Sequence, residues 1–239
     1  MFYQSIRIQI AIITKLINNT KFKIDKGDHL LDTHTHILWN IDDGSKNQCM
    51  SLQMLEIAAR SGTKAIFATP HVIERANKPS WEEIKEKTQQ LRQLCAEAQI
   101  DIMLYPGAEV QMNWELLPEL GATGAYCLNG GRYLLIELPA AEIPAYADEF
   151  WYELELKGIT PILAHPERYQ QLRENPDLLL LWRRRGMLMQ CNSGSFTGMF
   201  GSSVCENAKV LLANGLVDLL GSDGHRSEGR NTDMSRAAA

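Results

Sequence analysis

The sequence predicts an α/β fold, a distorted TIM-like (β/α)7 barrel, and two observations predict it. Short apolar runs alternate along the chain with segments of helical periodicity, and this alternation is typical of a parallel sheet. Histidines or carboxylates follow six of the seven apolar runs. In a barrel such positions meet at the carboxyl ends of the strands, whereas an open doubly wound sheet gathers its ligands at one switch point.

The expected strands are brief apolar runs, most of them bounded by polar residues, glycine or proline. In chain order they are residues 30–33, 65–68, 102–105, 133–138, 160–164, 187–191 and 217–220.

The segments between these strands carry helix signals. Residues 48–60 have apolar side chains at helical spacing and are followed by a glycine. Ser80 and Glu83 form a capping box for a helix to about Glu97. A short helix is expected at 116–120. The later helices start at a proline or a capping serine, and they run from Pro144 to Gly158, from Pro176 to Gly186 and from Ser202 to Asn214.

The length of the chain suits one domain. It has 239 residues, and an α/β barrel typically needs about 200–250. We expect this domain to span residues 30–239. We interpret residues 1–29 as an N-terminal extension that is non-native or mobile, because they lack the continuous apolar core and the small-residue cleavage site of a signal peptide.

The composition excludes several classes of function. A net charge of −5 argues against a surface that coats nucleic acid, and no apolar run approaches the ~18 residues of a membrane span. The five cysteines are scattered, which fits a reducing, cytoplasmic setting. None of them has an arginine six residues later, so a phosphatase with a cysteine nucleophile is not expected.

Nine nitrogen and oxygen ligands follow the apolar runs, and they predict a metal cleft at the carboxyl ends of the strands. Imidazole and carboxylate suit zinc, manganese and iron. The four carboxylates would repel one another without cations. Two ions about 3.5–4 Å apart are the usual arrangement for phosphoester hydrolysis. The nine ligands are His34, His36, Asp43, His71, Glu109, Glu137, His165, Asp223 and His225.

The motifs around these ligands resemble a known family. His34-Thr35-His36 and Ser222-Asp223-Gly224-His225 are similar to the outer signatures of the PHP (polymerase and histidinol phosphatase) superfamily. The closer resemblance is to the bacterial metal-dependent tyrosine phosphatases of the CpsB/CapC/YwqE group. It extends over about Leu30 to Arg230 and includes Asp42-Asp43-Gly44, Pro70-His71, Gly107-Ala108-Glu109, Ile136-Glu137 and Ala164-His165-Pro166-Glu167-Arg168-Tyr169.

The resemblance implies the PHP fold and a cleft with two or three divalent ions, usually Mn2+ with iron or zinc as substitutes. His34, His36, Glu109 and Asp223 would hold one ion. A second would share Glu109 and add Glu137 and His165, and a third would use Asp43, His71 and His225. The implied partner is the phosphotyrosine tail of a bacterial tyrosine kinase that controls capsule or exopolysaccharide synthesis. Family members also carry a further C-terminal helix, which we expect this chain to lack.

The expected mechanism is in-line attack of a metal-bridged hydroxide on phosphorus, without a phospho-enzyme. The resemblance implies that Arg168 and Arg230 grip the phosphoryl oxygens, for which a guanidinium fork is suited. His225 or Asp43 is expected to assist the leaving phenolate. Asp42 is expected to support a ligand or a turn. Trp39 and Phe200 either rim the cleft or pack in the core.

Three alternatives stay open. The first is another PHP phosphoesterase, such as a histidinol-phosphate or nucleotide phosphatase, with the same metals and a different substrate. The second is an inactive metal-binding module with a regulatory role. A metal-dependent amidohydrolase is weaker, because no lysine lies at an expected strand end. No nucleic-acid partner and no membrane insertion are expected, and a homo-oligomer is one option for the assembly.

Overall fold

The fold is built on parallel strands. The computed structural model describes residues 30–121 and 124–238, so the expected N-terminal extension lies outside the described residues. One sheet has the strand order β1-β2-β4, with β1 at Leu30–Thr35, β2 at Thr63–Ala68 and β4 at Met103–Pro106. The other has the order β3-β5-β6-β7-β8-β9, at His71–Val72, Glu109–Gln111, Tyr133–Glu137, Thr160–Ala164, Leu188–Asn192 and Leu219–Gly221.

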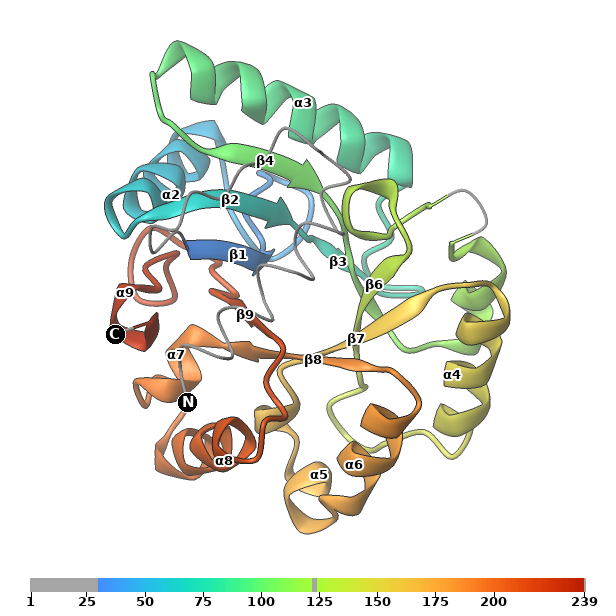
Figure 1. The fold of residues 1–239 in the computed structure, drawn as a ribbon. Helices are drawn as coiled ribbons and strands as arrows, with labels where there is room; N and C mark the ends of the chain where they lie inside the picture. The colour runs from blue at the N-terminus through green and yellow to red at the C-terminus, as the bar shows by residue number, and fades with distance from the viewer. Residues whose placement is uncertain (1–29, 122–123, 239) are drawn as a thin grey trace.

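The two sheets curl around a common centre, with the helices on the outside (Figure 1). The last strand lies beside the first. The His36 N–H donates to the Gly224 carbonyl at 3.0 Å, and the Asp223 N–H donates to the His34 carbonyl at 2.7 Å. The predicted α/β class is therefore confirmed, as a curled parallel sheet.

Two expected strands are each followed by a short strand that the sequence does not predict. The run 65–68 is followed by a separate strand β3, and the run 102–105 by a separate strand β5. Pro70 has no N–H to continue the ladder, and Gly107 approaches Leu128 so closely that a Cβ would lie 2.6 Å from its Cδ2. As a result His71 and Glu109 lie on strands rather than in loops, and they pair with each other in register.

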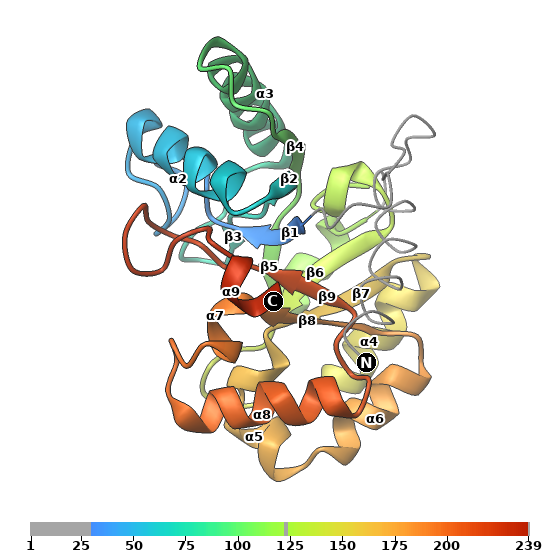
Figure 2. The same cartoon turned by 60° about the vertical axis from the view of Figure 1, so that its left-hand side comes forward.

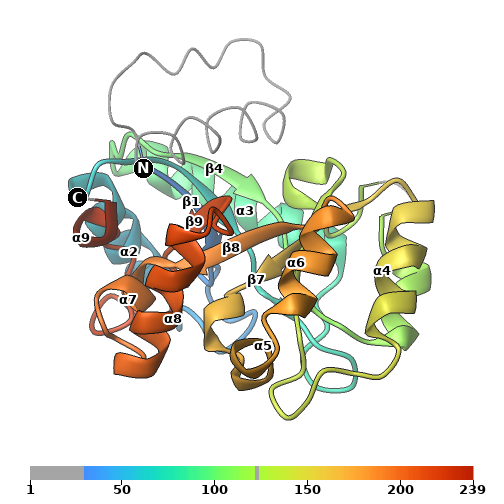
Figure 3. The same cartoon turned by 60° about the horizontal axis from the view of Figure 1, so that its bottom comes forward.

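The helices cover the outer faces of the strands. Helix α2 packs on β2 and α3 packs on β4, on one side of the molecule (Figure 2). Helices α4, α6 and α8 lie on the other side, around β7 to β9 (Figure 3). None of the helices in the described residues is both long and apolar enough to cross a bilayer. The bounds are Gln48–Arg60 for α2, Trp81–Glu97 for α3, Ala147–Leu156 for α4, Asp177–Arg184 for α6 and Ser202–Ala213 for α8.

Local capping explains where the helices begin. The Ser80 side chain accepts a hydrogen bond from the Glu83 N–H, as expected, and Asn47 caps α2 in the same way. The expected cap of α8 is wrong: Ser202 lies inside the helix, and Gly201 precedes it with φ 94°. The expected start at Pro144 is also wrong, because this residue forms a turn before α4.

The remaining helices are short, and the sequence predicts only the first of them. The segment expected as a helix at 116–120 is the 3-10 helix η1, Trp114–Glu119, which Asn113 caps. The others are η2 at Leu128–Gly130, η3 at Pro166–Arg168, α5 at Gln170–Glu174, α7 at Ser193–Phe196 and α9 at Ser235–Ala238.

Alternation along the strands separates two apolar clusters. On β6, Leu134 and Ile136 face the main core beneath the helices, while Tyr133 and Leu135 face a smaller cluster inside the curled sheet. Glu137 continues the inward face two residues later. The inner cluster therefore fills the amino-terminal half of the interior, and polar side chains occupy the carboxyl end.

Candidate metal centre

Four buried ligands from three parts of the chain meet at one point. His34 Nε2 lies 3.1 Å from His36 Nε2 and 3.1 Å from Glu109 Oε2. Asp223 Oδ1 lies 3.6 Å and 3.4 Å from the same two imidazole nitrogens. An ion about 2.0–2.2 Å from each ligand would place ligand atoms roughly 3.0–3.5 Å apart, so this spacing fits a metal.

A second group lies around Glu109 and Glu137. His165 Nε2 is 2.9 Å from Glu109 Oε1. His71 Nδ1 lies 3.1 Å from Glu109 Oε2 and 3.4 Å from Glu137 Oε1. Both oxygens of Glu109 thus face imidazoles, Oε1 that of His165 and Oε2 those of His34, His36 and His71. A carboxylate in this position would be able to bridge two ions.

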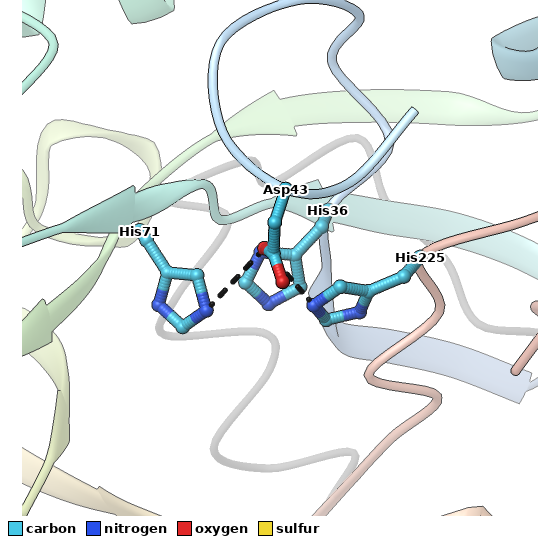
Figure 4. A group of neighbouring side chains, drawn as sticks. All are labelled: His36, Asp43, His71 and His225. Atoms are coloured by element: carbon cyan, nitrogen blue, oxygen red, sulfur yellow. Dashed lines mark ion pairs between the residues drawn. The ribbon is translucent and has the colours of Figure 1, made fainter. Parts of the chain in front are cut away.

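A third group lies toward the mouth of the cleft. Asp43 comes from the loop after β1, His71 from β3 and His225 from the segment after β9 (Figure 4). Asp43 Oδ1 lies 3.4 Å from His225 Nε2 and 3.7 Å from His71 Nε2. His36 belongs to the same group, since its ring centroid is 3.9 Å from that of His225. The structure therefore brings all nine expected ligands together.

Neighbouring side chains fix the orientation of two imidazoles. His34 Nδ1 donates to Gln190 Oε1 at 2.9 Å. His36 Nδ1 donates to Asp42 Oδ2 at 2.7 Å, and the same carboxylate accepts the backbone N–H groups of His71 and Gly44. In both histidines Nε2 is left to face the metal position, which is the usual arrangement for an imidazole ligand. Asp42 supports a ligand, as the sequence predicts.

The electrostatics favour the metal-binding forms of Glu109, Asp43 and His225. Burial opposes the ionisation of Glu109, yet His34 and His71 hold the pKa of its carboxyl well below its usual range. A hydrogen bond with His225 keeps the pKa of Asp43 below its usual range. Burial, reinforced by the charge of His36, lowers the pKa of His225 to about 4. Glu109 and Asp43 are then ionised and His225 is neutral at pH 7.

The environment of Asp223 also indicates that these residues suit divalent ions. Asp223 Oδ1 is fully buried and accepts no hydrogen bond from the described residues, although three imidazoles surround it. A buried carboxylate oxygen in this position is costly unless a cation compensates it. Oxygen and imidazole nitrogen together suit manganese, iron or zinc.

Two arginines reach the other oxygen of Asp223. Arg168 Nη1 donates to Oδ2 at 3.1 Å, and Arg230 Nη2 contacts the same oxygen. Asn192 Nδ2 also donates to it at 2.6 Å. Arg168 lies in η3 and Arg230 in the segment after β9, and the side chains of both are about one-third exposed. The arginines expected at the site are therefore adjacent to the ligand cluster.

Six of the nine expected ligands and both arginines line one cavity of about 470 Å³. Its remaining wall comes from the segment after β6 and from the start of α5. These wall residues are Leu138, Ala140, Ala141, Tyr169, Gln170 and Gln171.

Sequence reasoning missed Gln190 and Asn192. Both lie on β8, the one expected strand with no ligand after it, and they point inward after Leu188 at a spacing of two. The signal in the sequence was the alternation of Leu188, Gln190 and Asn192, which places all three side chains on the inner face of the strand. Of the two aromatic residues expected at the rim or in the core, Trp39 is buried in the core, whereas Phe200 lies against Arg168 and Arg230.

The fold and the site define a class of protein: α/β proteins with a curled parallel sheet and a histidine–carboxylate metal cluster at the strand ends. The fold is similar to that of histidinol phosphate phosphatase from Lactococcus lactis, with a TM-score of 0.54, 17% identity, and 87% and 93% of the two chains covered. The chain belongs to the family described as capsular polysaccharide synthesis, CpsB/CapC, whose model matches residues 30–239.

Relatives in this family are named tyrosine-protein phosphatases. The chain is 35% identical to YwqE from Bacillus subtilis over 208 residues, which cover 87% of this chain and 82% of that protein. It is 29% identical to CpsB from Streptococcus pneumoniae, with 87% and 88% covered. A solved chain from the study of YwqE and CpsB, described as metal-dependent tyrosine phosphatases, matches with 34% identity, a TM-score of 0.82, and 87% and 84% covered.

Proposed function

We propose that this chain is a metal-dependent protein-tyrosine phosphatase. The observation that carries the proposal is the position of Asp223, whose Oδ1 belongs to the imidazole cluster and whose Oδ2 holds two arginines. A phosphate monoester needs both features, because cations must neutralise its oxygens and orient phosphorus toward a nucleophile. The activity for which the relatives are named supports the same reaction.

The nine ligands would hold up to three ions. We assign one to His34, His36, Glu109 and Asp223. A second would share Glu109 and add Glu137 and His165, as the family resemblance implies. A third would use Asp43, His71 and His225, which group with His36. Manganese is the proposed metal, with iron or zinc as substitutes. Bound divalent ions would supply Lewis acidity toward phosphoryl oxygens and lower the pKa of a water molecule.

The arginines would bind the phosphoryl group. Each guanidinium offers several N–H donors in one plane, and Arg168 and Arg230 use only part of them on Asp223. Arg230 Nε is buried and has no partner among the described residues, so a donor remains for a further acceptor. Two guanidinium groups on one side of the cleft can donate hydrogen bonds to the three oxygens of a phosphate.

His225 and Asp43 are the expected candidates for assisting the leaving phenolate. With its pKa near 4, the His225 imidazole carries no proton to give at neutral pH, and Asp43 is ionised. We therefore assign both first to metal binding. Protonation of the phenolate, whose parent phenol has a pKa of about 10, would then depend on another donor in the cleft.

The proposed substrate is phosphotyrosine in the tail of a bacterial tyrosine kinase that controls capsule or exopolysaccharide synthesis, and the proposed setting is the cytoplasm. The family description links these proteins to capsule synthesis. We also propose that residues 30–239 form one phosphatase domain whose strands make a distorted seven-stranded barrel. Strands β2 with β3, and β4 with β5, would each count as one interrupted strand, and the backbone bonds between β1 and the segment after β9 would close it.

The test is manganese-dependent release of phosphate from a phosphotyrosyl peptide, a phosphoseryl peptide and histidinol phosphate, measured side by side. We expect turnover of the phosphotyrosyl peptide that a chelator and His36→Ala both abolish. Arg173→Ala is the matched control, because Arg173 bonds Ser203 outside the cleft. Preference for histidinol phosphate would identify a different phosphoesterase, and metal binding without any turnover would identify an inactive metal-binding module.

A further inference from the structure

Phe200 lies on a tight turn between α7 and α8. Glycines at 198 and 201 have φ of 83° and 94°, which only glycine adopts readily. The turn rests on Gly194, where a Cβ would lie 3.2 Å from Phe200 Cε2. The Met199 N–H donates to the Gly194 carbonyl at 3.0 Å. The backbone thus places the Phe200 ring at one location beside the cleft.

At that location the ring contacts both arginines of the site. The guanidinium carbon of Arg168 lies 4.7 Å from the Phe200 ring centroid, and that of Arg230 lies 5.6 Å from it. Both distances are within the range of a cation–π interaction. The two arginines come from segments some sixty residues apart in sequence, and among the described residues Phe200 and Asp223 contact both.

Core packing does not explain this ring. Phe196, at the end of α7, is also partly buried but packs against the main apolar core, whereas Phe200 does not belong to either apolar cluster of the described residues. The Phe200 ring instead faces two charged groups. The negative face of an aromatic ring attracts guanidinium groups and covers their planes, while the N–H donors at the edges stay free.

We propose that Phe200 is a positioning residue that holds Arg168 and Arg230 for phosphate. It offsets the repulsion between two neighbouring cations without using any of their hydrogen-bond donors, which a second carboxylate would occupy. Asp223 fixes one N–H of each guanidinium, and the ring fixes the plane. The inference rests on the proposed phosphate-binding role of the two arginines.

The experiment compares Phe200→Leu, Phe200→Tyr and Phe196→Leu with the unaltered chain, each loaded with manganese. Leucine keeps an apolar side chain on Gly194 but has no aromatic face, and tyrosine keeps the face. Phe196→Leu makes the same chemical change on a ring without a guanidinium contact. The first readout is the affinity for inorganic phosphate by calorimetry, and the second is KM and kcat on the phosphotyrosyl peptide. Metal content and the melting temperature are measured for all four proteins.

We expect Phe200→Leu to weaken phosphate binding and to raise KM by about tenfold, the effect of one partly desolvated cation–π contact, with metal content unchanged. Phe200→Tyr should retain the unaltered values, and Phe196→Leu should change only the melting temperature. Unchanged phosphate affinity in Phe200→Leu, or an equal loss in Phe200→Tyr, overturns the inference.

The two readouts also separate this inference from the proposed function. If the unaltered chain binds phosphate and only Phe200→Leu binds it weakly, Phe200 positions the arginines even where phosphotyrosine is not turned over. If the manganese-loaded unaltered chain binds no phosphate, the phosphate-binding role of the arginines and the role of Phe200 are both wrong.

Discussion

Arg168 Nη1 lies 3.1 Å from Asp223 Oδ2, while Oδ1 of the same buried carboxylate faces His34 and His36. Asp223 adopts φ 52°, a left-handed conformation that is uncommon outside glycine. Its N–H donates to the His34 carbonyl at 2.7 Å, which holds the turn after β9 against β1. One constrained residue therefore connects the ligand cluster with the cation that borders it.

The contact between Arg168 and Asp223 predicts that loss of the arginine affects catalysis and leaves metal binding unchanged. Arg168→Ala should lower kcat/KM on a phosphotyrosyl peptide by about 10²-fold, the loss typical of one oxyanion donor, with metal content unchanged. Arg168→Lys should recover only part of the loss, because an ammonium cannot make the two-pronged contact. Steady-state kinetics and elemental analysis measure both quantities, with Arg173→Ala as the control. Loss of metal in Arg168→Ala would show that the arginine maintains the ligand cluster instead.

Gln190 predicts an effect on metal affinity. Its Oε1 accepts the Nδ1–H of His34 at 2.9 Å, and its amide also donates to Asn192 Oδ1 at 3.0 Å. Gln190→Leu should weaken metal binding by about 10–100-fold, the usual effect of removing a group that orients a ligand. Competition with a chelator of known affinity measures it. Gln93→Leu makes the same change on the exposed surface of α3 and should leave the affinity unchanged; equal affinities in all three proteins would contradict the orienting role.

The histidines predict a pH dependence of metal binding. Burial opposes protonation of His34 and His36. The negative charges of Glu109 and Asp42 nevertheless raise the pKa values of these two imidazoles above the usual 6.5 in the metal-free protein. An ion must displace protons from these imidazoles, so the affinity for metal should fall as the pH decreases through their raised pKa values. Calorimetry in buffers of different ionisation enthalpy should show proton release. Binding heats independent of the buffer would contradict this expectation.

Metal should also stabilise the folded chain, because the four carboxylates and the imidazoles lie within one cleft. An ion at 100 times its dissociation constant contributes about 2.7 kcal/mol, if it binds only the native state. Adding a chelator to the metal-loaded protein should therefore lower its melting temperature. His36→Ala should abolish most of this shift, and a chelator effect of equal size in that variant would show that the metal binds elsewhere.

The cysteines predict a graded reactivity toward a thiol reagent at pH 8. Burial raises the pKa of the Cys127 thiol to about 12, so almost no thiolate forms there, and burial raises that of Cys191 well above its usual range. Cys49 is exposed and should react first. Mass spectrometry of the alkylated, native chain identifies the modified positions, and early modification of Cys127 would contradict the burial seen here.

Much of the site was predictable because most of its candidate ligands lie at or just after the end of an apolar run. Glu137, for example, follows an inward-facing pair on β6, and a carboxylate at the end of such a strand has to lie at the carboxyl edge of the sheet. The break before His71 was less visible, although Pro70 marks it. The role of Asp42 was predictable from its position one residue before a proposed ligand and two before Gly44, where its side chain accepts the Gly44 N–H.

The sequence by itself determined the main order of strands and helices, the parallel sheet and the choice of nine candidate ligands, because these depend on local periodicity and on residue chemistry at strand ends. Only the tertiary structure decided which side chains contact one another around these candidate ligands. Neither the two-sided position of Asp223, nor the contact of Phe200 with two arginines, nor the support of His34 by Gln190 follows from spacing along the chain. Each depends on which strands lie side by side when the sheet curls, and that is set by packing between residues far apart in sequence.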